Sequence, residues 1–115
     1  MSKPGAIAAA EALRLEDLIA PTPNGIASRV LAKTGGGNLT LFAFDAGEGL
    51  SEHTAPFDAI VIVLDGLLSL TIGGSVVAAE PGTIVRMPAN VPHAVDAREA
   101  SRMLLIMLRE TGATL

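Results

Sequence analysis

Two histidines, His53 and His93, are the residues of this sequence best suited to chemistry, and the chain has no others. A neutral imidazole can bind a divalent transition metal or exchange a proton near neutral pH. The chain contains no cysteine, which excludes disulfides, cysteine–zinc sites, iron–sulfur clusters and thiol nucleophiles. Two histidines alone are too few for a zinc site, since structural zinc takes four protein ligands and catalytic zinc normally takes three. No nucleophile-elbow motif accompanies them, so a serine–histidine–aspartate hydrolase cannot be argued.

Four apolar residues are candidates for the walls of a pocket. Phe42 and Phe44 share one face of an expected strand, and Met103 and Met107 share one face of another, because side chains two positions apart lie on the same side. Packing in the core is the commoner role of such residues. Arg86 is a candidate cation for a carboxylate ligand, with an exterior salt bridge as the commoner alternative.

Composition restricts the classes of protein to which the chain can belong. It has 115 residues, half of them hydrophobic, with 12 acidic and 8 Lys or Arg side chains. This describes one compact acidic domain rather than a disordered chain. A nucleic-acid partner is not expected, because there is no basic stripe and only 3% of residues are aromatic. No apolar run approaches the length of a membrane span, so we expect no membrane partner and a cytoplasmic location.

The elements that must position these residues are short strands. Turn signals at Gly and Pro separate nine apolar segments, a spacing typical of an all-β sandwich or barrel. Asp65-Gly66 predicts a two-residue hairpin, and residues 6–19, rich in Ala, Leu and Glu, predict a short helix. We therefore expect an N-terminal helix and loop over 1–25 and a barrel over 26–115. The nine expected strands are 26–33, 39–45, 50–55, 60–64, 67–72, 75–79, 83–87, 93–97 and 102–109.

Two of these segments, 59–64 and 103–108, are apolar at consecutive positions rather than at alternate ones. A strand of this kind needs cover on both faces. One face can pack inside a small barrel, whereas the other must meet the N-terminal segment or another molecule. We expect a homodimer that buries the outer face of this sheet, with cover by the N-terminal segment alone as the alternative.

Both histidines lie within glycine-bounded stretches of defined spacing. Five residues separate Gly47 from His53, and Gly66 ends that stretch; five residues separate Gly82 from Pro88, and His93 follows. This pattern resembles the two motifs of the cupin superfamily. The first is Gly, five residues, His, any residue, His, three or four residues, Glu, six residues, Gly. The second is Gly, five residues, Pro, any residue, Gly, two residues, His, three residues, Asn.

The resemblance spans residues 47–97 and implies an all-β double-stranded β-helix, the jelly-roll barrel of cupins. It also implies that His93 points toward the same interior spot as His53. Strand parity then places Ser51 and Ala55 on the same face as His53.

The departures from the motifs affect the expected chemistry. Ala55 stands in place of the second His, Ala59 in place of Glu, Asn90 in place of Gly and Ala97 in place of Asn. In metal-binding cupins three His and one Glu hold the metal. The resemblance therefore implies the barrel and its pocket without the usual metal chemistry.

Three roles remain open for the two histidines. They can satisfy each other, with water or a backbone carbonyl as further partners. They can bind a metal whose coordination is completed by water or substrate. They can also donate hydrogen bonds to an acidic or carbonyl ligand in a pocket.

Our main hypothesis is a small single-domain cupin, of unassigned activity, that binds a small molecule in the barrel. The alternative is a metal-dependent cupin enzyme of the isomerase or dioxygenase type, with Zn, Ni, Mn or Fe on the incomplete pair His53 and His93. The pocket candidates are His53, His93, Ala55, Ala59, Phe42, Phe44, Met103 and Met107.

Overall fold

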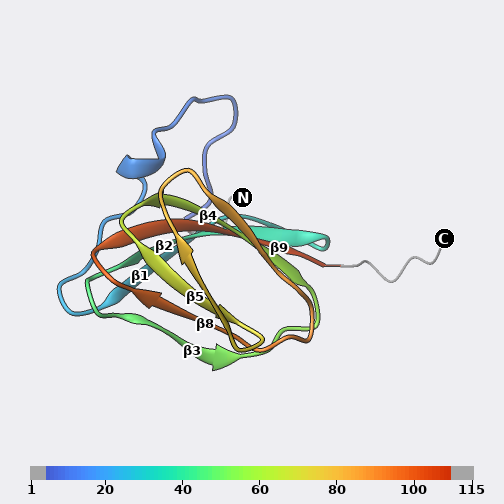
Figure 1. Cartoon of the computed structure of the whole chain (residues 1–115). Helices are drawn as coiled ribbons and strands as arrows, with labels where there is room; N and C mark the ends of the chain where they lie inside the picture. Colours follow the sequence, from blue (N-terminus) through green and yellow to red (C-terminus); the bar gives the residue numbers. More distant parts are fainter. Residues whose placement is uncertain (1–4, 110–115) are drawn as a thin grey trace.

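The computed structural model describes residues 5–109. Their regular structure is almost entirely β (Figure 1), which confirms the all-β prediction. The outer ends of the two expected units, residues 1–4 and 110–115, lie outside the described residues. The elements are η1 (Leu15–Asp17), β1 (Ile26–Thr34), β2 (Gly37–Phe44), β3 (Gly49–His53), β4 (Asp58–Asp65), β5 (Leu68–Ile72), β6 (Ser75–Ala79), β7 (Ile84–Met87), β8 (His93–Ala97) and β9 (Ser101–Leu108).

The strands form two antiparallel sheets that face each other. One has five strands in the order β1-β2-β9-β4-β7, and the other has four in the order β3-β8-β5-β6. Figure 1 shows β2, β9 and β4 on one side of the barrel and β3, β8 and β5 on the other. The two strands without alternation, β4 and β9, pair with each other inside the larger sheet. Their inward side chains, such as Val61, Val63 and Met103, are almost completely buried.

The expected hairpin at Asp65-Gly66 is wrong. Strand β4 pairs with β7 and β9, whereas β5 pairs with β6 and β8. The chain therefore crosses from one sheet to the other at this turn. Leu68 and Leu70 in β5 are fully buried, so this crossing lets both sheets contribute apolar residues to the same core.

Gly66 makes the crossing possible. Its φ of +81° is in the left-handed region that glycine occupies without strain. A Cβ at this position would also collide with the Ser101 hydroxyl and the carbonyl oxygen of Ala100. The next residue, Leu67, donates its N–H to Ser101 Oγ at 2.9 Å. This hydrogen bond holds the crossing against the end of the turn between β8 and β9.

The expected N-terminal helix is also wrong, since only the three-residue 3-10 turn η1 forms. Before this turn the backbone bonds to the barrel: Ile7 donates its N–H to Leu31 O at 3.0 Å. Ala10 adopts a φ of +60°, which interrupts any helix. A short helix has a costly nucleus, and here the barrel offers the backbone other partners.

Two arginines also hold the N-terminal segment on the five-stranded sheet. Arg29 Nη1 donates to Leu18 O at 3.1 Å, and Arg102 Nε donates to Ile19 O at 3.0 Å. The segment lies on the side of this sheet that faces away from the four-stranded sheet (Figure 1). In the described part of the chain, no helix is long and apolar enough to cross a membrane.

Candidate functional site

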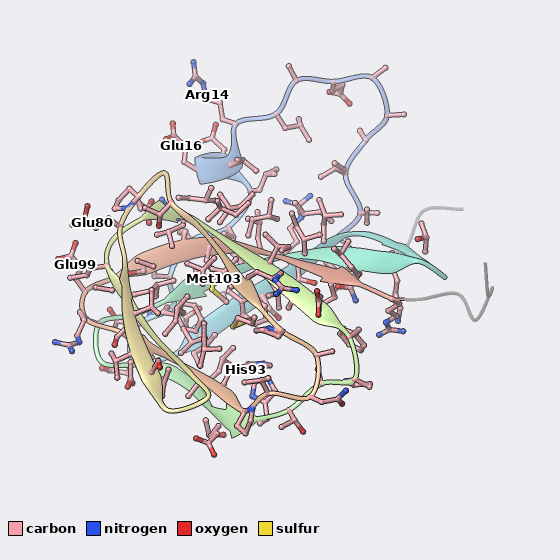
Figure 2. All side chains as sticks on the ribbon, turned by 45° about the vertical axis from the view of Figure 1, so that its right-hand side comes forward. Arg14, Glu16, Glu80, His93, Glu99 and Met103 are labelled. Atoms are coloured by element: carbon pink, nitrogen blue, oxygen red, sulfur yellow. The ribbon has the colours of Figure 1, made fainter. Side chains whose placement is uncertain are left out.

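His53 and His93 are neighbours across the pair of strands β3 and β8. Their Nε2 atoms lie 3.1 Å apart, and their rings meet edge to face at an angle of 71°. His93 is 4% exposed, whereas His53 is exposed. Figure 2 shows His93 and Met103 between the two sheets. The pair therefore forms one polar centre at the rim of the barrel interior.

An irregularity in β3 decides which residues accompany His53. Leu50 pairs with Val95 and His53 pairs with His93, so β3 uses one residue more than β8 over this stretch. Such an extra residue reverses the face on which the following side chains lie. Leu50 therefore shares the interior with His53, and Ser51, expected there from parity, is exposed.

Backbone carbonyls fix the orientation of both rings. His53 Nδ1 lies 2.8 Å from Ser51 O, and His93 Nδ1 lies 3.2 Å from Val91 O. A carbonyl oxygen only accepts hydrogen bonds, so each Nδ1 carries the proton that it donates. In a neutral imidazole the other nitrogen is then an acceptor. When both rings are neutral, two lone pairs therefore face each other across 3.1 Å, and a proton on one ring, a ligand donor or a metal ion is needed to satisfy both.

Protonation of the His93 ring would provide a donor, but burial disfavours the charged ring. Burial lowers the pKa of His93 below its ordinary value; the bond to Val91 O opposes this effect, and the charge of His53 adds to it. His93 is therefore held neutral near pH 7. A hydrogen-bond donor from a ligand, or a metal ion, would satisfy the two Nε2 atoms without charging this ring.

The pair opens into a mainly apolar cavity of about 380 Å³, its mouth included. Four of the expected pocket residues lie here with the histidines, namely Ala55, Ala59, Met103 and Met107. Phe42 and Phe44 do not line it; they stack on each other with centroids 5.9 Å apart and pack in the core. The other lining residues are Leu50, Phe57, Met87, Val95 and Leu105.

The sequence contained a signal for three of the residues that it did not single out. Leu105 lies between Met103 and Met107 at the same parity, Val95 follows His93 by two, and Phe57 precedes Ala59 by two. Leu50 carried no such signal, because the irregularity in β3 changes its face. Met87 lines the cavity because β7 pairs with β4, which places Met87 opposite Ala59.

Asp58 holds the second histidine-bearing stretch against β4. Its Oδ1 accepts the N–H of Ala89 and its Oδ2 accepts Arg86 Nη1, both at 2.9 Å. These two bonds, the one to Ala89 first, lower the pKa of Asp58. Arg86 is thus an exterior ion-pair residue, as the commoner alternative predicts. Asn90 donates its N–H to Ala55 O at 2.7 Å, which joins the two histidine-bearing stretches directly.

The donor set fits a resident metal only in part. Nitrogens 3.1 Å apart can be neighbouring ligands of one ion at about 2.0–2.1 Å from each. Within residues 5–109, however, no third His, Asp or Glu joins the pair to make a metal-binding group. Ala55 and Ala59 offer only methyl groups to the cavity. The site therefore supplies two of the three or four ligands that a protein-held zinc ion uses.

Comparison with known proteins identifies the family. The sequence model described as "Cupin domain" matches residues 40–108, more than half of the chain. This chain belongs to the cupin family. The match includes both histidine-bearing stretches of the cupin, strands β3 to β9 and the larger part of β2.

Solved structures resemble this cupin over nearly its whole length. A conserved protein of unknown function from Streptococcus pyogenes is 33% identical, with a TM-score of 0.88 over 96% of each chain. A cupin superfamily protein from Desulfitobacterium hafniense is 26% identical, with a TM-score of 0.86 over 95% of this chain and 100% of that one. A cupin 2 conserved barrel domain protein from Leptotrichia buccalis is 34% identical, with a TM-score of 0.81 over 84% of this chain and 47% of that one. No curated protein matches the sequence.

Proposed function

We propose that this cupin binds a small, mainly apolar molecule in the barrel cavity, with His53 and His93 as the polar contact. The observation that carries the proposal is the pair of Nε2 acceptors, 3.1 Å apart, at the edge of an otherwise apolar cavity. Ligand sites typically combine apolar walls with a few placed polar groups. The proposal assigns no reaction to the site.

The orientation of the imidazoles selects the polar group of the ligand. With both Nδ1 protons directed at carbonyls, the rings accept hydrogen bonds at Nε2. The ligand therefore donates, as a phenol or alcohol does. This reverses the polarity expected from the sequence, in which the histidines donate to an acidic or carbonyl ligand.

A matched pair of probes tests this function. We expect p-cresol, which carries a hydroxyl donor, to bind more tightly than p-methylanisole, which has the same apolar body without the donor. His53→Ala and His93→Ala should abolish the difference, whereas Glu52→Ala, an exposed neighbour, should preserve it. Binding is followed by heteronuclear NMR shifts of the methyl groups of Met103 and Met107, which line the cavity in every variant. Equal affinities for the two probes in the wild-type protein would contradict the proposal.

A second candidate function is metal binding by the same pair, as in a metal-dependent cupin enzyme of the isomerase or dioxygenase type. The convergence of the two Nε2 atoms, 3.1 Å apart, favours it. The ion would provide Lewis acidity. Water or substrate would complete its coordination, because the described residues supply only the two histidines.

Metal binding is tested by loading the protein with Zn, Ni, Mn or Fe, dialysing it and measuring retained metal by elemental analysis. One retained ion per chain, lost in His53→Ala and His93→Ala and kept in Glu52→Ala, would establish this candidate. No retention above the level of the double histidine variant would remove it.

We further propose a homodimer formed through the outer face of the five-stranded sheet. That face carries half-buried or exposed aliphatic side chains from β4, β7 and β9, with Ile84 66% and Leu108 51% exposed. The register places Ile60 beside Ile106 and Ile62 beside Leu104. The N-terminal segment is bonded to β1 and to the Arg102 end of β9. We therefore propose that a second copy of the chain covers the rest of this face.

We also propose a cytoplasmic location, which the absence of cysteine supports.

A further inference from the structure

Asn38 is a buried polar residue whose hydrogen bonding is incomplete. It lies in β2 and is 8% exposed. Its Oδ1 is fully buried and has no hydrogen-bond partner among residues 5–109. A buried polar atom without a partner lowers the stability of a protein. Such an atom therefore points to a missing partner, such as a ligand.

The strand register connects Asn38 with the cavity. Asn38 lies opposite Met107 of β9, and Met107 lies opposite Ala59 of β4. Met107 and Ala59 both line the cavity. One row farther along, Thr40 is also buried and lies opposite Leu105, another lining residue. Strand β2 thus carries two polar residues directly beside the apolar wall that faces the histidines.

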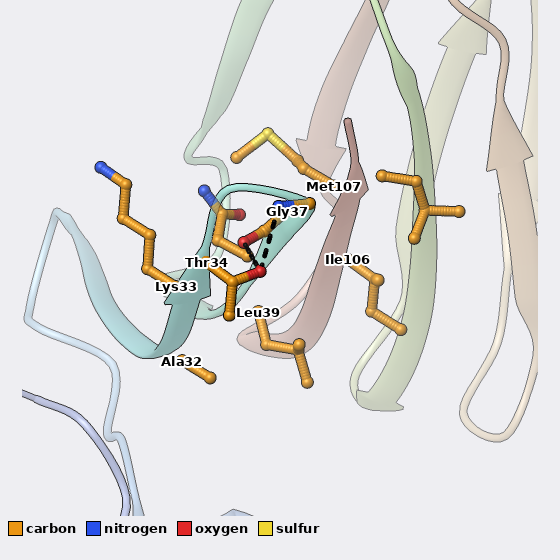
Figure 3. Close-up of a pocket in the computed structure, with 10 residues that line it drawn as sticks. Ala32, Lys33, Thr34, Gly37, Leu39, Ile106 and Met107 are labelled. Atoms are coloured by element: carbon orange, nitrogen blue, oxygen red, sulfur yellow. Dashed lines mark hydrogen bonds between the residues drawn. The ribbon is translucent and has the colours of Figure 1, made fainter. Parts of the chain in front are cut away.

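An open surface hollow lies at the β1–β2 hairpin and the end of β9 (Figure 3), on the outer side of the sheet, because Leu39 and Ile106 line it. On the inner side of the sheet, Met107 lies between Asn38 and Ala59 in their row and separates Asn38 from the cavity. A methionine has three rotatable bonds and adapts readily to its surroundings. A change of its rotamer is the smallest movement that would bring Asn38 into the ligand site.

We propose that Asn38 is a second polar contact for the ligand, reached past Met107, and that it takes a hydroxyl group. This inference rests on the proposed function, because it concerns the far end of the same ligand. The ligand class is then an apolar small molecule with two hydroxyl groups, one for the two histidines and one for Asn38.

The surroundings of Asn38 favour a hydroxyl over a charged group. The neighbour of Asn38 on β1 is Lys33, whose positive charge disfavours a cationic donor. The free Oδ1 repels a carboxylate, because both are acceptors. A hydroxyl both donates and accepts, so it satisfies the amide in either of its two orientations.

The first test measures stability without any ligand. Asn38→Leu removes the unpartnered oxygen at nearly constant shape, so we expect the melting temperature of the free protein to rise by a few degrees. Ser69→Ala is the control, since Ser69 is a buried polar residue of the four-stranded sheet that lines neither space, and it should not raise the melting temperature. A lower melting temperature for Asn38→Leu would show a structural role for the amide and overturn the proposal.

The second test compares p-hydroxybenzyl alcohol with p-cresol, which lacks the second hydroxyl. In the wild-type protein we expect the alcohol to bind about 3- to 10-fold more tightly and to shift the side-chain amide signals of Asn38. Asn38→Leu should remove the advantage and keep p-cresol binding, and Ser69→Ala should keep both.

The outcomes separate this inference from the proposed function. If p-cresol binds through the histidines but the alcohol has no advantage in the wild-type protein, Asn38 is not a ligand contact and the proposed function stands. If neither probe binds the wild-type protein, both proposals fail. The wild-type comparison decides the matter even if Asn38→Leu does not fold.

Discussion

At the scale of single residues, two backbone carbonyls determine what the histidines can do. Ser51 O and Val91 O hold the Nδ1 protons, so Nε2 is the nitrogen that each ring offers. The sequence places both histidines near turns but does not show which nitrogen is free. That information comes from the carbonyl two residues before each histidine, one in β3 and one in the turn before β8. The directions of these carbonyls depend on the local backbone.

The lowered pKa of His93 predicts how stability changes with pH. In the unfolded chain a histidine takes up a proton below about pH 6.5, whereas folded His93 resists protonation because it is buried. The unfolded state then binds more protons, so His93 lowers the free energy of unfolding as the pH falls. We expect wild type to lose more stability than His93→Gln between about pH 7.5 and about pH 5.5.

Urea denaturation with a chelator present measures this difference. The carboxylates are common to both proteins and cancel in the comparison. A wild-type advantage over His93→Gln that grows on acidification would contradict the prediction, because it would mean that folded His93 binds its proton more tightly than the unfolded chain does.

At the scale of elements, the turns decide which strands pair. The segment after Asp65-Gly66 looks like the second half of a hairpin, yet β5 joins the other sheet. In a hairpin, β5 would pair with β4. Both edges of β4 are already paired, one with β7 and the other with β9. The packing of Ser101 and Ala100 against Gly66 favours the crossing, and that contact is distant in the sequence.

Gly66→Ala should therefore destabilise the protein more than a matched substitution elsewhere. Gly82 is the control, because its φ of +83° is close to the +81° of Gly66 and nothing lies within 4 Å of the Cβ position. We expect Gly82→Ala to lower the free energy of unfolding by about 1 kcal/mol for the left-handed backbone alone. Gly66→Ala should cost clearly more, because the collision with Ser101 and Ala100 adds to this. Equal losses in urea denaturation would show that the β8–β9 turn moves aside freely.

At the scale of the whole molecule, the outer face of the five-stranded sheet carries exposed aliphatic side chains, among them Ile84 and Leu108. Its aliphatic side chains come from strands whose opposite faces fill the core. The two-sided apolar character of β4 and β9 was visible in the sequence. The N-terminal segment takes only part of the outer face, which favours a dimer over cover within one chain.

Ile106→Lys should convert the proposed dimer to a monomer, since Ile106 lies between Leu39 and Ile60 on the outer face. Val76→Lys is the control, because Val76 is 67% exposed on β6 in the other sheet. Multi-angle light scattering at micromolar concentration should return twice the chain mass for wild type and Val76→Lys, and the single mass for Ile106→Lys. A single mass for wild type would contradict the dimer.

The sequence by itself determined the fold class, the turns at Gly and Pro, and the positions of the two histidines in a cupin-like pattern. Local chemistry is sufficient for these features, because turn residues and short apolar segments act over a few positions. The strands expected over 26–33, 39–45, 67–72 and 75–79 form as β1, β2, β5 and β6. They pair as two hairpins, β1 with β2 and β5 with β6.

The tertiary structure alone decided the rest. It replaced the helix expected over 6–19 with a segment bonded to β1 and directed β5 to the second sheet. It also brought Leu50 inward through an irregularity in β3, and left Asn38 Oδ1 with no partner among the residues that the structure describes. Each of these features depends on a contact between residues far apart in the chain. Propensity and periodicity describe only neighbours in sequence, so they carry no information about such contacts.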